Sequence, residues 1–213
     1  MKRFIFKWFT PLLLILLHVI IMVILSLSIV LFSPLLRNLV VQVEAFDGLA
    51  TQISLLLTVL ISYKFFPIDK KILNLNIKIK RLLYLIFIGC GLFAMNVSTM
   101  SLLGAPFPKN PYGDNHLFQI IGIVSIFIAS IVEELFFRGI IFNNLVKRYP
   151  FWLSAVYSSV LFAAVHISVT KLIPTFIIGM VLCWVLKKEQ KIIYCIMIHL
   201  IINIFSEMVY YIQ

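Results

Sequence analysis

Long apolar runs separated by short polar segments dominate the chain. Seven of these runs approach or exceed the length of about 20 apolar residues that a helix needs to cross a bilayer. They cover residues 10–32, 49–66, 82–103, 117–143, 152–169, 172–186 and 192–211, of which the sixth is the shortest. The pattern predicts an all-α polytopic membrane protein with about seven transmembrane helices.

The composition agrees with this prediction. Of the 213 residues, 62% are hydrophobic and 12% are charged, whereas about a quarter of the residues of a soluble domain are charged. The net charge of +10 could indicate a nucleic-acid partner. The basic residues lie instead in short clusters between apolar runs, which is how membrane orientation is encoded. We therefore expect the lipid bilayer as a partner and no nucleic acid.

The distribution of basic residues also predicts an orientation. If the N-terminus is cytosolic, the inner segments hold 14 basic residues and the outer loops hold 3. The inner ones are Lys2, Arg3, Lys7, Lys64, Lys70, Lys71, Lys78, Lys80, Arg81, Lys147, Arg148, Lys187, Lys188 and Lys191, and the outer ones are Arg37, Lys109 and Lys171. Because basic loops stay in the cytosol, we expect a cytosolic N-terminus and an external C-terminus. The frequent Ile, Lys, Asn and Phe residues favour a bacterial cell membrane.

Three charged residues lie inside the fourth apolar run, in the stretch "ASIVEELFFRGIIF". Each charge costs at least about 2.5–3.5 kcal/mol at the centre of a membrane helix, so intramembrane charges usually have a function. Glu134 and Arg138 are four residues apart and share a helix face, which predicts an ion pair. Glu133 points about 100° away from Glu134 on an α-helix and is expected to face a partner on another helix.

Further polar groups lie at similar depths in later runs. The segment "FAAVH" places Phe162 and His166 on one face of a helix, and "HLIIN" does the same for His199 and Asn203. An imidazole and an amide one turn apart form a two-donor patch that can hold a developing oxyanion. We expect the three helices to enclose a cavity that opens to the cytosolic side. Glu207 lies on the same side as His199 and is expected to reach the outer interface.

The three segments together resemble a family signature. "EELFFR" fits E-E-x-x-x-R, "FAAVH" fits F-x-x-x-H and "HLIIN" fits H-x-x-x-N, in the order found in the CAAX-processing and bacteriocin-processing (CPBP, or Abi) intramembrane proteases. That family includes the Ras-converting CAAX endoprotease. The resemblance covers about residues 117–211 and implies two regions, an N-terminal transmembrane region at 1–116 without a matched motif and a catalytic core at 117–213.

The resemblance implies an intramembrane endopeptidase that cleaves membrane-associated peptides or proteins. Carried over to the matching positions, Glu133 and His166 would activate the attacking water. His199 and Asn203 would hold the oxyanion of the intermediate.

Three further residues are expected to have supporting roles, the first two from the same resemblance and the third from its place beside His166. Glu134 and Arg138 would stabilise the site structurally, and Phe162 would pack around it.

The sequence also bears on metal dependence. Members of this family are often catalogued as metalloendopeptidases, yet the chain has no HExxH helix motif, the strong signal for a zinc protease. Glu133, His166 and His199 could still form a three-ligand zinc site. We expect no metal and no other required cofactor, with one zinc ion at these three residues as the alternative.

Two other functions are compatible with the sequence. Buried Glu and His residues also serve transporters and proton relays, which would move ions or solutes without proteolysis. A bacteriocin self-immunity protein on the same scaffold is the other possibility, and immunity could itself depend on proteolysis.

Overall fold

Helices form every regular element of the described chain, which comprises residues 11–21, 23–24, 43–105, 116–166 and 168–212 of a computed structural model. The elements are a helix at Pro11–Ile21, α2 (Val43–Tyr63), α3 (Ile79–Leu102), α4 (His116–Glu134), η1 (Leu135–Phe142), α5 (Asn143–Leu145), α6 (Phe151–Ala164), α7 (Val169–Glu189) and α8 (Ile192–Ile212). The predicted all-helical fold is confirmed. A chain within lipid must satisfy its backbone hydrogen bonds internally, and helices do so.

The expected number of seven membrane spans is confirmed only in part among the described residues. Four helical segments of the described chain are long and apolar enough to cross a membrane: Ile79–Leu102, Gln119–Leu145, Val169–Glu189 and Ile192–Val209. The helices at Pro11–Ile21, Ala50–Tyr63 and Phe151–Ala164 are apolar but shorter. The sixth predicted span, 172–186, is longer than expected, because α7 extends from Val169 to Glu189.

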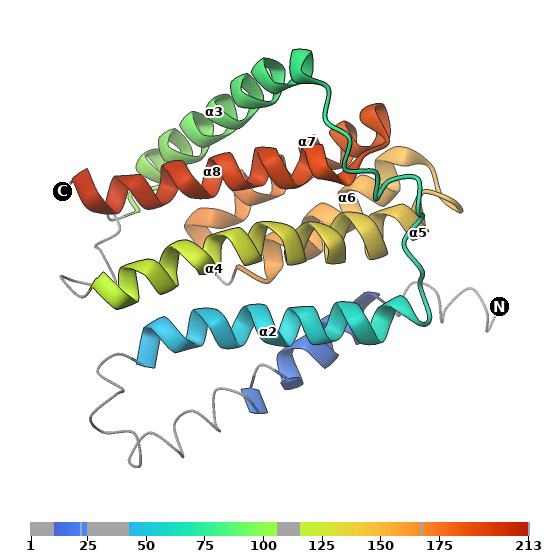
Figure 1. Cartoon of the computed structure of the whole chain (residues 1–213), viewed down its shortest axis with the longest axis horizontal. Helices are drawn as coiled ribbons and strands as arrows, with labels where there is room; N and C mark the ends of the chain where they lie inside the picture. The colour runs from blue at the N-terminus through green and yellow to red at the C-terminus, as the bar shows by residue number, and fades with distance from the viewer. Residues whose placement is uncertain (1–10, 22, 25–42, 106–115, 167, 213) are drawn as a thin grey trace.

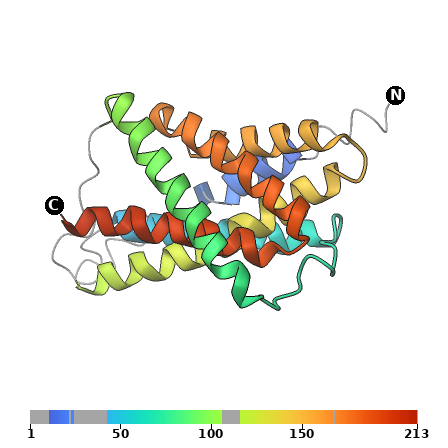
Figure 2. The same cartoon turned by 90° about the horizontal axis from the view of Figure 1, so that it is seen from above.

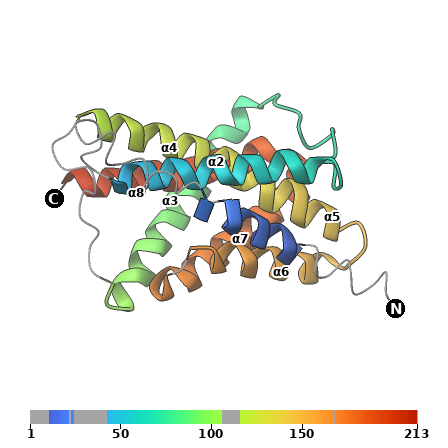
Figure 3. The same cartoon turned by 90° about the horizontal axis from the view of Figure 1, so that it is seen from below.

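The long helices form successive layers. In Figure 1, α3 lies at the top, followed by α8, α4 and α2, with α6 and α7 behind them. Figure 2 shows α3 crossing obliquely over α8 and α7. Figure 3 shows α2 along α4 on the opposite side, beside the helix at Pro11–Ile21. Helix α8 is therefore enclosed by α3, α4 and α7, which places its polar residues inside the bundle.

The connections rich in basic residues gather at one end of the bundle, on the right in Figure 1. The loop between α2 and α3 is tied to the turn between α7 and α8 by a hydrogen bond from Ile192 N–H to Ile72 O, at 2.9 Å. An ion pair between Arg81 and Glu189, at 3.4 Å, joins the same regions. We call this end the basic end.

The charged helix changes its winding directly after the two glutamates. Residues Leu135–Phe142 form a π-helix, and seven of the eight side chains are buried. This segment packs against α2, α6, α7 and α8, which accounts for its burial. The Ser158 hydroxyl of α6 donates to Phe137 O at 3.0 Å and supports the altered backbone. Short π-helical stretches occur frequently at functional sites.

Close packing of α3 on α8 depends on one glycine. A Cβ atom at Gly89 would lie 2.7 Å from Ile201 Cγ2, whereas a Cβ atom at Gly91 would meet nothing within 4 Å. Small residues allow membrane helices to approach closely and gain packing energy. We predict that Gly89→Ala lowers stability by about 1–3 kcal/mol, the usual cost of overpacking.

Thermal unfolding in detergent measures this effect, with Gly91→Ala on the same helix as the matched control. The control should lose no stability, because alanine favours the helix and has free space. Equal unfolding temperatures for the two variants would contradict the proposed α3–α8 contact.

Candidate active site

One carboxylate group lies at the centre of the polar interior. Glu134 and Arg138 have no exposed side-chain surface and form an ion pair, with Arg138 Nη1 2.9 Å from Glu134 Oε1. The same oxygen accepts a hydrogen bond from His199 Nδ1, also at 2.9 Å. The pair expected from the spacing is therefore present, and it has an additional partner on α8.

Arg138 links the ion pair to two more helices. Its Nη2 atom lies 3.5 Å from the carbonyl oxygen of Gly179 on α7, and its guanidinium carbon lies 4.2 Å from the centroid of the Phe162 ring on α6. A Cβ atom at position 179 would lie 2.8 Å from Ser159 Cβ, so the glycine allows α6 and α7 to approach. A cation above an aromatic face is attracted to it, more strongly when water is excluded.

Polar residues recur every four positions on α4 and on α8 and meet in register. Glu134 meets His199, and four residues away on each helix Ser130 meets Asn203, where Asn203 Nδ2 donates to Ser130 Oγ at 3.1 Å. The two helices run antiparallel, so residue numbers decrease along α4 as they increase along α8 from one pair to the next. Ser130 was not among the residues expected from the sequence. Its spacing of four from Glu134 was the available signal.

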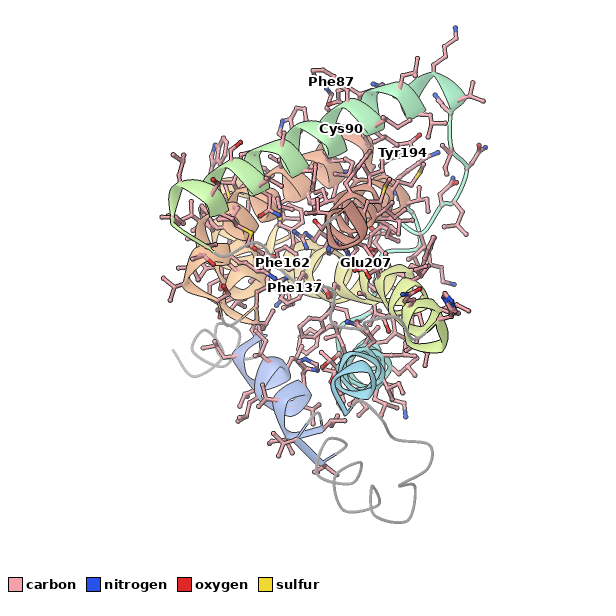
Figure 4. All side chains as sticks on the ribbon, turned by 90° about the vertical axis from the view of Figure 1, so that its left-hand side faces the viewer. Phe87, Cys90, Phe137, Phe162, Tyr194 and Glu207 are labelled. Carbon is pink, nitrogen blue, oxygen red and sulfur yellow. The ribbon has the colours of Figure 1, made fainter. Side chains whose placement is uncertain are left out.

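Phe162 connects the aromatic and polar parts of the site. Its ring centroid lies 5.1 Å from that of Phe137, 4.9 Å from that of His166 and 5.7 Å from that of His199. Figure 4 shows Phe137 and Phe162 side by side in the interior of the bundle. Buried aromatic rings beside the imidazoles keep bulk water away from them. The predicted packing role of Phe162 matches these contacts.

His166 lies just beyond the end of α6. Its Nδ1 atom lies 2.8 Å from the carbonyl oxygen of Phe162. Because a carbonyl only accepts, Nδ1 carries the hydrogen, and Nε2 of the neutral ring keeps its lone pair. His166 can therefore accept a proton or a hydrogen bond through Nε2.

Glu133 occupies a different position from Glu134. Its Oε2 atom is buried without a hydrogen-bond partner among the described residues and lies 3.9 Å from His199 Nε2. Within that part of the chain, no direct hydrogen bond joins Glu133 to His166, although the two are close enough to interact electrostatically. The structure therefore separates the two glutamates as expected and places the His199 imidazole nearest to Glu133.

A cavity of about 220 Å³ lies beside these groups. It is lined by Asn96, Ile126, Phe162, His166, Lys171, Thr175, Ile178, His199, Ile202, Asn203, Ser206 and Glu207. Three of the four predicted catalytic side chains thus share one cavity, whereas Glu133 is not part of its lining.

The cavity extends away from the basic end, and the expectation that it opens on the cytosolic side stays a prediction. Its outer lining comes from Lys171 at the start of α7 and Glu207 near the end of α8. Both segments lie at the end opposite the basic connections. Helix α6 has 14 residues, about 21 Å at 1.5 Å per residue, and His166 lies just beyond the end of α6 that is away from the basic end.

The described side chains do not form a ready metal site. No group of three His, Cys, Asp or Glu residues within the described ranges has a suitable arrangement for a metal ion. Nδ1 of His199 is engaged by Glu134, and Nδ1 of His166 is engaged by Phe162 O. One nitrogen remains on each ring, but these nitrogens and Glu133 do not converge as three zinc ligands. We therefore assign no reaction step to a metal.

Comparisons with known proteins found a similar family and a similar protein. The family described as "Type II CAAX prenyl endopeptidase Rce1-like" matches residues 115–205, a range that contains all three motifs. A Bacillus subtilis (strain 168) protein named "Putative membrane peptidase YdiL" is 32% identical over 83 residues, which is 39% of this chain and 34% of that protein. The match thus spans about a third of the length of this relative. No solved structure matches the chain.

The matched segment is the same part of the chain that holds the ion pair, the two imidazoles and the amide. Through residues 115–205, the chain is similar to the Rce1-like family of type II CAAX prenyl endopeptidases.

Proposed function

We propose that the protein is an intramembrane endopeptidase that hydrolyses peptide bonds of membrane-associated peptides or proteins. The observation that supports this most directly is the cavity, where His166, His199 and Asn203 face one space close to the unpartnered Glu133 carboxylate oxygen. A base, an imidazole acceptor and an amide donor are the groups that water-based peptide hydrolysis requires.

The proposed reaction begins with water held by Glu133 and His166 Nε2. Glu133 takes a proton from the water as the oxygen attacks the scissile carbonyl carbon. His199 and Asn203 then hold the oxyanion that forms. Glu133 returns the proton to the leaving nitrogen, the C–N bond breaks, and a carboxylic acid and an amine result.

His199 can act as an oxyanion donor in one charge state only. Its Nδ1–H donates to Glu134, so Nε2 carries a hydrogen only when the ring is an imidazolium. The Glu134 carboxylate stabilises that positive charge from the side away from the cavity. In this proposal Glu134 supports the chemistry as well as the structure, which adds to its expected role beside Arg138.

The experiment for this function is a cleavage assay with purified protein and fluorogenic peptides that carry an apolar segment. We predict that Glu133→Gln lowers turnover by at least about 100-fold, since general bases contribute about 10²–10⁴-fold. The unfolding temperature should stay near that of the wild type, because Gln has the same shape and, among the described residues, the ion-pair partner of Glu133 is the His199 imidazole at 3.9 Å, beyond hydrogen-bonding distance.

Retained cleavage in Glu133→Gln would remove this residue from the mechanism. A transporter or proton relay would show no peptide cleavage in the wild type.

The same assay in the presence of phenanthroline tests the proposal that no metal cofactor is required. We expect the turnover to be unchanged by the chelator. Loss of activity that stoichiometric zinc restores would make Glu133, His166 and His199 candidate ligands.

A further prediction concerns Glu134. Glu134→Gln leaves Arg138 buried and unpaired, and breaking a buried pair by removing one partner costs about 3–5 kcal/mol. Both abundance and thermal stability should fall together with turnover. The double variant Glu134→Gln with Arg138→Gln should recover part of the stability, because contacting residues are coupled. Strictly additive effects in thermal unfolding would contradict the role assigned to the pair.

We further propose seven spans with a cytosolic N-terminus, based on the fourteen-to-three distribution of basic residues and on the alternating direction of the helices. Reporters fused to the two termini should then give opposite locations, with the C-terminal one external. The basic end would face the cytosol and the cavity would open towards the outer side. Reporters on the same side of the membrane would exclude an odd number of spans.

A further inference from the structure

A carboxylate that lies outside all three motifs faces the same cavity. Glu207, near the end of α8, is 9% exposed, and its Oε1 atom is buried without a hydrogen-bond partner among the described residues. Figure 4 shows it at the inner side of α8, towards α4. The sequence had suggested that Glu207 reaches the outer interface, but the side chain lines the cavity instead. It lies just beyond the segment matched by the family, 115–205.

The register between α4 and α8 explains why Glu207 has no partner. His199 of α8 bonds to Glu134 of α4. Four residues later on α8 and four residues earlier on α4, Asn203 bonds to Ser130. The next position on α8 is Glu207, and the corresponding position on α4 is Ile126, which lines the cavity beside it. The row of polar residues on α8 therefore extends to Glu207, whereas the row on α4 ends at Ser130.

A buried carboxylate needs a positive or hydrogen-bonding partner, because desolvation without one is costly. Lys171 lines the cavity as well, but its side chain is exposed and forms no ion pair with Glu207 in the described structure. No cation among the described residues pairs with Glu207, and a cation of a bound substrate would complement its ionised carboxylate. The space in front of the carboxylate is the cavity in which a substrate would lie.

We propose that Glu207 is a specificity-determining residue that binds a basic side chain of the substrate. This inference rests on the proposed peptidase function. Glu207 is one helical turn from Asn203, about 6 Å along α8. An extended peptide advances about 3.3–3.6 Å per residue. With the scissile carbonyl at Asn203, Glu207 meets a Lys or Arg within about two residues of the cleaved bond.

The experiment uses purified full-length protein and an equimolar peptide library in which Lys, Gln and Glu occur equally at every position. Mass spectrometry identifies the cleaved bonds, and kcat/KM is then measured for matched Lys, Gln and Glu peptides. The wild type should favour Lys over Gln near the cleaved bond by about tenfold or more, as expected for a charge-assisted hydrogen bond. Glu207→Gln should remove this preference, and Glu207→Lys should favour Glu peptides.

Asp69→Asn is the matched control, because it removes one negative charge at the basic end and can still accept the Lys71 N–H bond. It should keep the wild-type preference. Cleavage without any charge preference in the wild type, or a preference unchanged by Glu207→Gln, would overturn this inference while leaving the peptidase function intact. A wild type that cleaves no peptide would overturn the proposed function and this inference together.

Discussion

The interior depends on the Glu134 carboxylate, because one of its oxygens binds two groups from different helices. Arg138 and His199 both lie 2.9 Å from Glu134 Oε1, and Arg138 extends the cluster to Gly179 O and to the Phe162 ring. The charges offset one another in a region where each alone would be costly. The cluster therefore holds α4, α6, α7 and α8 in one arrangement and orients the His199 ring.

Much of this arrangement follows from the sequence by simple rules. Long apolar runs predicted helices, because a helix satisfies its own backbone within lipid. A spacing of four predicted the Glu134–Arg138 pair, which the structure contains. The same rule applied to α4 and α8 together could have suggested that Ser130 and Asn203 also meet, since both continue stripes of polar residues.

Other features required the packing between helices, which local spacing does not specify. The His199–Glu134 bond depends on the register of α8 against α4, and the winding of Leu135–Phe142 departs from the α-helix on which the expected angles were based. The side on which the cavity lies depends on the length of α6, which ends at Ala164 rather than near residue 169. The buried position of Glu207 likewise follows from helix contacts.

The hydrogen bonds of Ser130 have a consequence for the direction of the Asn203 amide. A hydroxyl carries one hydrogen, and that of Ser130 is donated to Ile126 O at 2.8 Å. Ser130 can therefore only accept from Asn203, so one Nδ2–H of the amide is directed to α4, and the second N–H of the same nitrogen is left for the proposed oxyanion. The buried Ser130 hydroxyl thus keeps the Asn203 amide from flipping, because only the nitrogen end of the amide can donate to it.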